Sequence, residues 1–184
     1  HFKYTDDGWL SELRCENAAT GTQITQWIRG VTKAQGSAIN SNRLVVQKVF
    51  PDGSVPTDCL TFKYNRQQEV FAVKDQSGTI HEYGIDKLGR RVEDAVTTFG
   101  TGVDQTVNKL EFGWNERGLL ARAASRNTSG GTIRNEVKWQ YTAFDQAQIE
   151  WQEHGGAVNT GTSLKVQYAW ANGANNTTRQ TGIT

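Results

Sequence analysis

Residues 110–118 are Leu-Glu-Phe-Gly-Trp-Asn-Glu-Arg-Gly, and this stretch decides the fold class of the chain. Its first five residues alternate, so that Leu110, Phe112 and Trp114 point to one face of an extended strand. An Asn follows the last aromatic residue, and Gly118 stands four positions after that aromatic. Because Gly adopts a positive φ without steric cost, this spacing predicts a short hairpin loop that ends in a left-handed residue.

The same pattern, a pair of large residues two positions apart followed by a turn, recurs along the chain. The second large residue of each pair is termed its anchor, and the anchors are Tyr4, Tyr64, Ile85, Trp114, Tyr141 and Trp170. The last five anchors are separated by 21, 29, 27 and 29 residues, and 11 of the 18 aromatic side chains occupy the large positions of these units. Gln68 and Asp145 stand where other units place the turn Gly. The spacing indicates an internal repeat of hairpin units.

Strands and turns account for most of the chain, whereas helical signals are weak. Apolar residues rarely persist at i, i+3, i+4 spacing for three turns, while Thr, Val, Gly and Asn are abundant. Two further turns are predicted at Phe50-Pro51-Asp52-Gly53 and at Asn172-Gly173. The chain is therefore predicted to be all-β, with repeated β-hairpins that form an extended antiparallel sheet.

The composition fits a thin sheet better than a thick core. Hydrophobic residues make up 36% of the 184 residues, so the aromatic side chains must supply much of the apolar packing. A two-layer core would need more Val, Ile and Leu than the chain contains. Polar residues occupy alternate strand positions, which indicates that both faces of the sheet meet water. These residues are Lys3, Lys63, Glu111, Lys138 and Gln167.

The charge balance argues against several function classes. Lys and Arg number 20 against 19 Asp and Glu, and the resulting net charge of +1 argues against nucleic acid as a partner. No run approaches the ~18 apolar residues of a membrane span, so we expect no membrane insertion of this segment. The chain starts at His1 in the middle of the strand pattern, so we expect it to be a segment of a longer protein.

The stretch 64–92 closely resembles RHS/YD repeats, whose units contain Tyr-Asp-x-x-Gly-Arg-Leu followed by a strand that ends at the next Tyr. Residues 114–120 and 2–10 match the same frame, and the resemblance covers nearly the whole chain. The departures from the family pattern are Ile85 and Trp114 at the Tyr position, and Thr5, Asn65 and Asn115 at the Asp position.

This resemblance implies a function as well as a fold. Members of the family wind hairpins into a spiralling sheet that forms the wall of a shell or barrel, as in bacterial RHS proteins, the toxin-enclosing part of insecticidal toxin complexes and teneurins. Residues 1–184 are then expected to be one array of about six to seven degenerate hairpin repeats. The implied function is a structural segment of a secreted or cell-surface protein that encloses or presents another polypeptide. The implied partners are the remaining repeats and an enclosed polypeptide cargo.

Motifs for catalysis or metal binding are absent from the sequence. His1, His81 and His154 fall in no paired metal-ligand spacing, and the chain has neither a G-x-S-x-G elbow nor a phosphate loop. Gly100-Thr101-Gly102 is too short for a dinucleotide fingerprint, and Asp6-Asp7-Gly8 fits a hairpin turn better than a calcium loop. We therefore expect no enzyme activity, no catalytic, cofactor-binding or metal-binding residues, and no cofactor.

Three alternatives stay open at the level of sequence. Cys15 and Cys59 form no metal motif, and they are either one disulfide of a secreted protein or two free thiols. Trp9, Trp27 and Trp151 lie outside the anchor positions, so a carbohydrate-binding adhesin that stacks surface glycans on aromatic rings is one alternative function. The other is a self-assembling subunit of an extracellular filament or tube, because unpaired hairpin edges template pairing with other copies.

Overall fold

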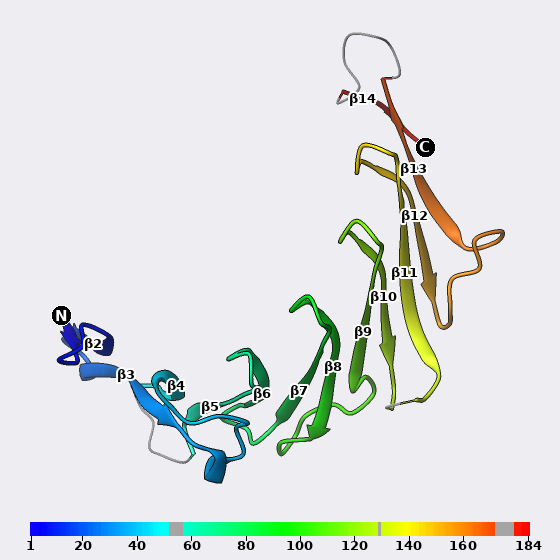
Figure 1. The fold of residues 1–184 in the computed structure, drawn as a ribbon. Helices are drawn as coiled ribbons and strands as arrows, with labels where there is room; N and C mark the ends of the chain where they lie inside the picture. Colours follow the sequence, from blue (N-terminus) through cyan, green and yellow to red (C-terminus); the bar gives the residue numbers. More distant parts are fainter. Residues whose placement is uncertain (52–56, 129, 172–178) are drawn as a thin grey trace. The chain divides into compact units, whose positions relative to one another are not determined.

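The computed structural model describes residues 1–51, 57–128, 130–171 and 179–184; Asp52-Gly53 and Asn172-Gly173 of the two further predicted turns lie outside them. Within these ranges, 14 antiparallel strands follow one another in chain order in one open sheet (Figure 1), which confirms the all-β prediction. One short 3-10 helix, η1 (Lys33–Gln35), lies between β3 and β4. The strands are β1 (Phe2–Tyr4), β2 (Leu10–Asn17), β3 (Gly21–Val31), β4 (Ser41–Val49), β5 (Cys59–Tyr64), β6 (Val70–Lys74), β7 (Ile80–Ile85), β8 (Arg91–Thr98), β9 (Lys109–Trp114), β10 (Leu120–Arg126), β11 (Ile133–Tyr141), β12 (Ala147–His154), β13 (Leu164–Trp170) and β14 (Gln180–Ile183).

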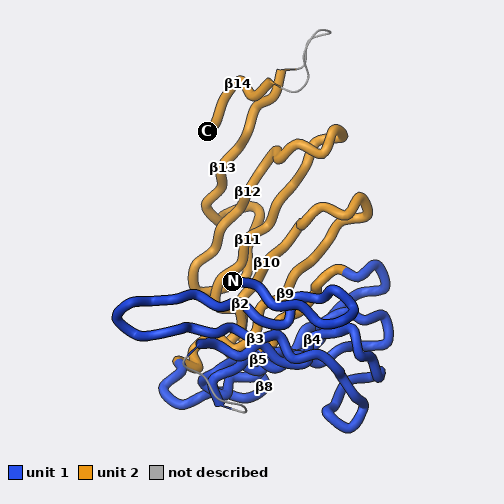
Figure 2. Tube along the Cα trace, turned by 90° about the vertical axis from the view of Figure 1, so that its left-hand side faces the viewer, with its two compact units in different colours: residues 1–89, 96–103 blue, residues 90–95, 104–184 orange. Residues whose placement is uncertain are grey.

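The chain divides into two compact units by its internal contacts (Figure 2). The first unit comprises residues 1–89 and 96–103, and the second comprises residues 90–95 and 104–184. The first half of β8 belongs to the second unit, where Glu93 pairs in register with Glu111 of β9. The first unit therefore contains β1–β7, the second contains β9–β14, and β8 contributes to both.

The anchors end their strands, as the alternation predicts. The strands β1, β5, β7, β9, β11 and β13 end at Tyr4, Tyr64, Ile85, Trp114, Tyr141 and Trp170, respectively. At five of these strand ends the residue pairing with the next strand shifts by one position, either at the anchor or on the strand opposite it. Such a shift marks a β-bulge. A bulge disrupts the regular ladder and sharpens the local twist. The anchor is thus the point at which each strand passes into its turn.

Five of the turns that follow anchors share one hydrogen-bonding pattern. The backbone amide of the fourth turn residue donates to the carbonyl of the first, in the pairs Gly8–Thr5 (2.9 Å), Gln68–Asn65 (3.2 Å), Gly89–Asp86 (3.1 Å), Gly118–Asn115 (3.0 Å) and Asp145–Thr142 (3.2 Å). The side-chain oxygen of the first residue accepts further amides: Asn115 Oδ1 accepts those of Arg117 at 3.0 Å and Leu119 at 2.9 Å. This second role explains why Asn, Asp and Thr follow the anchor.

Gln68 and Asp145 adopt the backbone conformation expected of the Gly that they replace. Their φ angles are 69° and 62°, and Gly8, Gly89 and Gly118 have φ angles of 77°, 78° and 82° at the same turn position. This confirms the register predicted for both turns. The left-handed conformation costs a residue with a side chain about 1–2 kcal/mol. The two turns without Gly therefore carry a strain that the other three avoid.

Replacing Gln68 with Gly is expected to stabilise the chain. Gly occupies the left-handed region freely, although its larger freedom in the unfolded chain offsets part of the gain. We expect Gln68→Gly to raise the free energy of unfolding by about 0.5–1 kcal/mol, measured by urea denaturation. Gln67→Gly is the matched control, because the φ of Gln67 is not positive and the same change there should destabilise the turn. A loss of stability in Gln68→Gly would contradict the turn geometry.

Few side chains in the sheet are fully buried, as the low aliphatic content suggests. The buried apolar residues of the described ranges are Val31, Val46, Val49, Cys59, Tyr64, Ala72, Ala124, Trp151 and Val158. In the first unit, Val31, Val46 and Tyr64 form one cluster, against which Phe62 and Val70 also pack. Large apolar residues such as Leu88 and Leu164 are exposed. Polar interactions between hairpins must therefore add to apolar burial in holding the sheet together.

Candidate functional site

Three anchor rings of the second unit connect successive hairpins through their polar ends. The donors and acceptors are Trp114 Nε1 and Arg91 O at 2.9 Å, Tyr141 Oη and Leu120 O at 2.6 Å, and Trp170 Nε1 and Ala147 O at 2.7 Å. Each acceptor stands two positions after the left-handed residue of the preceding turn. The repeat unit therefore includes a hydrogen bond from its anchor ring to the backbone of the hairpin before it. Such contacts couple neighbouring repeats in stacked arrays.

The ring hydrogen bond gives a physical reason for Trp and Tyr at the anchors. In the first unit, the Tyr64 hydroxyl likewise donates to Val45 O at 2.8 Å. Burial raises the pKa of both Tyr64 and Tyr141, so both hydroxyls keep the proton that they donate. Alternation in the sequence marks the anchors as packing residues, but it does not reveal this polar role.

Two successive turns of the second unit, the β9–β10 turn and the β11–β12 turn, are also linked by Arg117. Its guanidinium donates to the carbonyls of Ala143 at 3.0 Å and Thr142 at 2.9 Å, and pairs with Asp145 at 2.5 Å. Arg117 is the third residue of one hairpin turn, and its three partners belong to the next turn. The anchor bonds thus connect each of these hairpins to the strand before it, and Arg117 adds a link between two successive turns.

Removing the hydroxyl of Tyr141 tests the anchor bond directly. Tyr141→Phe keeps the ring but leaves Leu120 O without its 2.6 Å donor, and we expect a loss of about 1 kcal/mol in the free energy of unfolding. Tyr4→Phe is the control, because Tyr4 is an exposed anchor whose ring donates no hydrogen bond among the described residues. Chemical denaturation of both variants should separate them; equal effects would argue against a coupling role for the hydroxyl.

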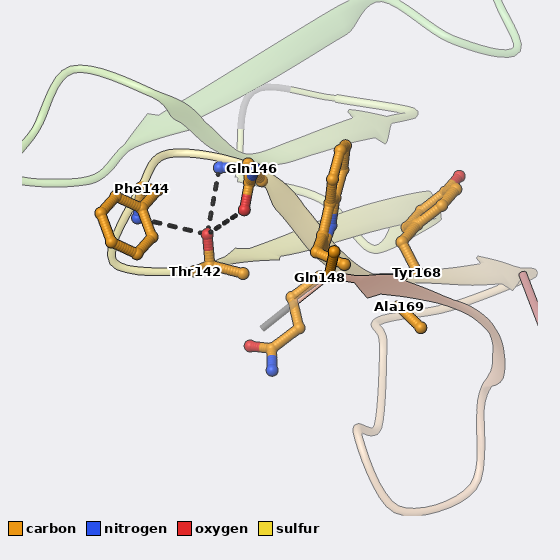
Figure 3. Close-up of a pocket in the computed structure, with 8 residues that line it drawn as sticks. Thr142, Phe144, Gln146, Gln148, Tyr168 and Ala169 are labelled. Atoms are coloured by element: carbon orange, nitrogen blue, oxygen red, sulfur yellow. Dashed lines mark hydrogen bonds between the residues drawn. The ribbon is translucent and has the colours of Figure 1, made fainter. Parts of the chain in front are cut away.

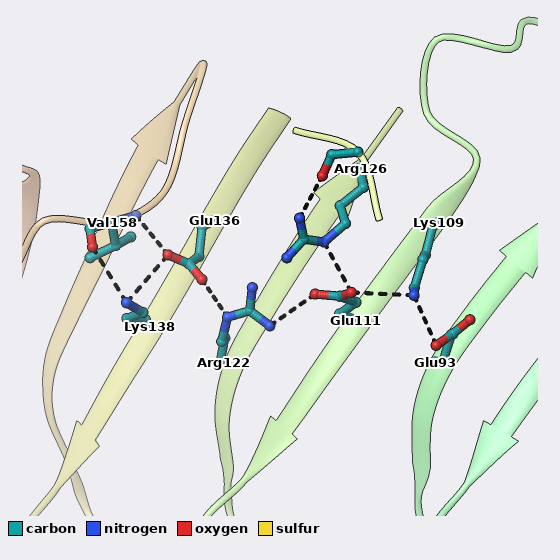
Figure 4. A network of polar contacts seen from close by, with 9 residues as sticks. Glu93, Lys109, Glu111, Arg122, Arg126, Glu136, Lys138 and Val158 are labelled. Atoms are coloured by element: carbon teal, nitrogen blue, oxygen red, sulfur yellow. Dashed lines mark hydrogen bonds and ion pairs between the residues drawn. The ribbon is translucent and has the colours of Figure 1, made fainter. Parts of the chain in front are cut away.

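Carboxylates and cations alternate in a row across β8 to β11 on one face of the second unit (Figure 4). In order, the pairs are Lys109 with Glu93 at 3.0 Å and with Glu111 at 3.3 Å, Glu111 with Arg126 at 3.0 Å and with Arg122 at 3.2 Å, and Glu136 with Arg122 and with Lys138 at 3.4 Å. The sequence marks Glu111 and Lys138 only as polar alternate residues. In the structure both are half-buried in this ionic row, which links four adjacent strands.

Glu136 is the most deeply buried member of the ionic row, with 2% of its side chain exposed. Burial alone would raise the pKa of this carboxyl group, but Arg122, the Val158 amide and Lys138 outweigh it and hold the pKa of Glu136 below its usual range. At the other end of the row, pairing with Glu93 raises the pKa of Lys109. These groups therefore stay ionised at neutral pH.

The ionic row also holds the loop between β12 and β13 against the sheet. The Val158 amide donates to Glu136 Oε2 at 2.6 Å, and Val158 itself is buried. A second attachment lies nearby, where the Trp151 indole donates to Thr160 O at 3.2 Å. One carboxylate and one indole thus fix the loop 155–163 to strands β11 and β12.

The titratable candidates from the sequence lie in different parts of the fold. His154 is exposed at the end of β12, whereas His81 is half-buried on β7 with its ring 6.5 Å from that of Tyr83. No group of three or more His, Cys, Asp or Glu within the described ranges could hold a metal ion. Cys15 is exposed and Cys59 is buried, and no disulfide joins them. Of the two alternatives for the cysteines, the structure has the one without a disulfide.

The three tryptophans proposed as glycan platforms differ in their surroundings. Trp151 is only 8% exposed, so its place in the adhesin hypothesis is wrong: a buried ring cannot stack on a sugar. Trp27 is half-buried, with Lys48 Nζ 5.8 Å from its ring centroid. Trp9 is 38% exposed, and two arginines approach its ring. Period-2 alternation does not distinguish these environments.

A groove of about 410 Å³ opens beside the β11–β12 turn in the second unit (Figure 3). The Thr142 hydroxyl oxygen accepts the amides of Phe144 at 3.2 Å and Gln146 at 3.3 Å, and the Phe144 side chain is 69% exposed. The lining residues are Thr142, Phe144, Gln146, Gln148, Tyr168, Ala169, Trp170 and Ala171. The groove adjoins in sequence a segment outside the described residues, and its lining alone indicates no particular ligand.

No helix of the described residues is both long and apolar enough to cross a membrane. The sequence matches no family model and no curated protein. Its fold, in contrast, matches solved structures. The crystal structure of TcdB2-TccC3-Cdc42 superposes on 94% of this chain with a TM-score of 0.62 and 9% sequence identity. That of TcdB2-TccC3-TEV superposes on 91% with a TM-score of 0.56 and 8% identity.

The chain shares its fold with a segment of these TcdB2-TccC3 chains. It covers 9% of the first matching chain and 8% of the second, so the likeness concerns a small part of a much larger molecule. At such low identity the match shows the fold alone.

Proposed function

We propose that the chain is a structural segment of an RHS/YD-repeat protein of the toxin-delivery or intercellular-interaction type, secreted or at the cell surface. In this proposal its sheet is part of a wall that encloses or presents another polypeptide. The fold match over 94% of the chain to a TcdB2-TccC3 structure is the observation that carries the proposal. The repeated anchor, turn and ring hydrogen bond support it, because they let further hairpins be added in the same way.

The electrostatics favour a structural role over a catalytic one. Glu111 and Glu136 are held ionised by the cations around them, and each of these cations belongs to a neighbouring strand or to the same one. A carboxylate in that state is unsuited to donating a proton at neutral pH. It is well suited to joining strands. We therefore propose that this segment has no enzyme activity of its own.

The test uses the full-length protein that contains this chain. Electron microscopy should show closed particles, and limited proteolysis should leave an enclosed polypeptide intact until mild denaturation opens the wall. The same polypeptide expressed alone is the matched control and should be degraded at once. Particles with an open, empty sheet, or equal degradation of the enclosed and free polypeptide, would overturn the proposal.

A self-assembling filament is the second candidate, and the edges of the sheet favour it. In the described strand order, β1 and β14 each have a single paired neighbour. Phe2 and Tyr4 on β1 and Ile183 on β14 are exposed. Exposed apolar edges can pair with a strand from another copy. Long polymers in negative-stain micrographs would support this candidate, and discrete closed particles would favour the wall.

A further inference from the structure

The β3–β4 hairpin of the first unit carries cations without any carboxylate. Residues 17–51 contain four Lys or Arg and no Asp or Glu. This differs from the second unit, where an ionic row balances its cations with carboxylates on neighbouring strands. The net charge of +1 for the whole chain hides this separation. A local excess of positive charge raises the concentration of anions near the surface.

Two arginines of this hairpin converge on one aromatic ring. The guanidinium carbons of Arg29 and Arg43 lie 5.1 and 5.4 Å from the centroid of the Trp9 ring. Arg29 also donates to the backbone carbonyl of Arg43 at 2.5 Å, which fixes its position. Neither guanidinium pairs with a carboxylate within the part of the chain that the structure describes, so both keep donors for an oxyanion.

Lys48 extends the positive charge along the same face. Lys48 pairs in register with Trp27, which stands two positions before Arg29 on β3, so Lys48 and Arg29 lie on the same side of the sheet. Lys48 Nζ lies 5.8 Å from the Trp27 ring and 5.0 Å from the ring of Phe50. Five residues of a strand span about 16 Å. Lys48 therefore stands about 16 Å along β4 from Arg43, so the positive charge extends along the hairpin.

We propose that this basic face, defined by Trp9, Trp27, Arg29, Arg43 and Lys48, binds an anionic polysaccharide. Sulfate or carboxylate groups of the sugar chain would pair with the two guanidiniums and with the Lys48 ammonium. Arg matches such oxyanions because its planar fork donates two parallel hydrogen bonds. The proposal goes beyond the wall function, since it gives one surface of the wall a ligand.

Two other polyanions fit this face less well. Single-stranded nucleic acid gains much of its affinity from bases stacked on free aromatic faces, whereas Trp9 and Trp27 are already contacted by cations of the chain itself. An acidic peptide could not add a strand here, because β3 and β4 are each paired on both sides. Pairing of charges on a saccharide requires neither a free ring face nor a free sheet edge.

Calorimetric titration of the chain with heparin, at physiological salt, tests the proposal. We expect the chain to bind heparin and not uncharged dextran. The double variant Arg43→Gln, Lys48→Gln should weaken heparin binding by about tenfold or more, since each substitution removes a charged donor. The matched control removes two exposed turn cations of the same unit, Arg66→Gln with Lys87→Gln, and should change the affinity by less than about twofold. Circular dichroism establishes that both double variants are folded.

Three results would overturn the proposal. The first is the absence of heparin binding by the unmodified chain. The second is equal weakening in both double variants, which would mean that general charge and not this face attracts the polymer. The third is equally tight binding of oligo-dT or polyglutamate with the same dependence on Arg43 and Lys48, which would assign the face to nucleic acid or to an acidic polypeptide. Preferential binding of heparin that depends on Arg43 and Lys48 supports the proposal.

Discussion

Glu136→Gln is expected to lower the free energy of unfolding by about 3 kcal/mol. The carboxylate is almost fully buried and serves Arg122, Lys138 and the Val158 amide at the same time. The amide of Gln has the same shape but no charge, so it leaves Arg122 and Lys138 with less compensation in a partly buried site. Removing one partner of a buried ion pair costs far more than the pair itself contributes. Urea denaturation at neutral pH measures the loss.

The pH dependence of stability gives this prediction a second readout. The folded state holds the pKa of Glu136 below its usual range, so the unfolded state binds more protons as the pH falls. The stabilisation by Glu136 is therefore complete above the unfolded pKa of about 4.3 and is lost as the pH falls through the lower folded value. Acid unfolding of Glu136→Gln should depend less steeply on pH below about 5, because the variant lacks this titrating group.

Glu116→Gln is the matched control for both measurements. Glu116 is exposed in the turn after Trp114, and the same substitution there should change stability by less than about 0.5 kcal/mol. Its acid unfolding should follow that of the unmodified chain. If Glu136→Gln were as stable as Glu116→Gln, the ionic row would contribute little to stability, and the loop 155–163 would be held by its other contacts, such as the Trp151 indole bond to Thr160.

The local features of the sheet could be predicted from the sequence because they depend on neighbouring residues. The strand ends at the anchors were predictable from the alternation of large and polar residues. Tyr141, for example, is the last large residue of its run and also the last residue of β11. The left-handed conformation of Gln68 and Asp145 followed from the repeat frame, even though neither residue favours it. Both inferences use only the strand period and the chemistry of one turn.

The contacts between hairpins were not predictable in the same way. Arg122 and Glu136 meet because β10 pairs with β11 so that Arg122 lies opposite Lys138 and Ala124 opposite Glu136, and that register is invisible in the residue pattern of either strand. The anchor bond from Trp114 to Arg91 likewise joins residues 23 positions apart. Alternation determines the face on which a side chain lies, whereas its partner on that face depends on every turn and bulge between them.

The two units show that one repeat can serve two kinds of surface. In both, an anchor ring donates to the backbone of an adjacent strand, as Tyr64 does in the first unit and Tyr141 in the second. The alternate strand positions then differ in charge. Glu111 and its neighbours neutralise one another, whereas Arg43 and Lys48 form no ion pair among the described residues. Because the structural bonds use the anchors and the turns, the alternate positions are free to vary in charge without loss of the fold.

Trp151→Ala is expected to have the largest effect of any single substitution in the second unit, a loss of about 3–5 kcal/mol in the free energy of unfolding. Its ring is buried at the centre of β12, where it pairs in register with Lys138 of β11 and Lys165 of β13. The substitution removes this packing and the bond to Thr160, so the loop 155–163 loses one of its hydrogen bonds to the sheet. Chemical denaturation gives the energetic loss, and limited proteolysis should show faster cleavage in the loop.

Two further variants distinguish packing from hydrogen bonding at this position. Trp151→Phe keeps most of the ring but not the indole donor, so it should lose less stability than Trp151→Ala and still cleave faster in the loop. Trp9→Ala removes a ring that is 38% exposed in the first unit and should cost only about 1 kcal/mol without changing cleavage of the loop. If Trp151→Ala were no more costly than Trp9→Ala, burial of Trp151 could not be what holds the loop to the sheet. The loop would then depend on its other hydrogen bonds to the sheet, such as those from the Val158 amide to Glu136 and from Ser163 to Glu153.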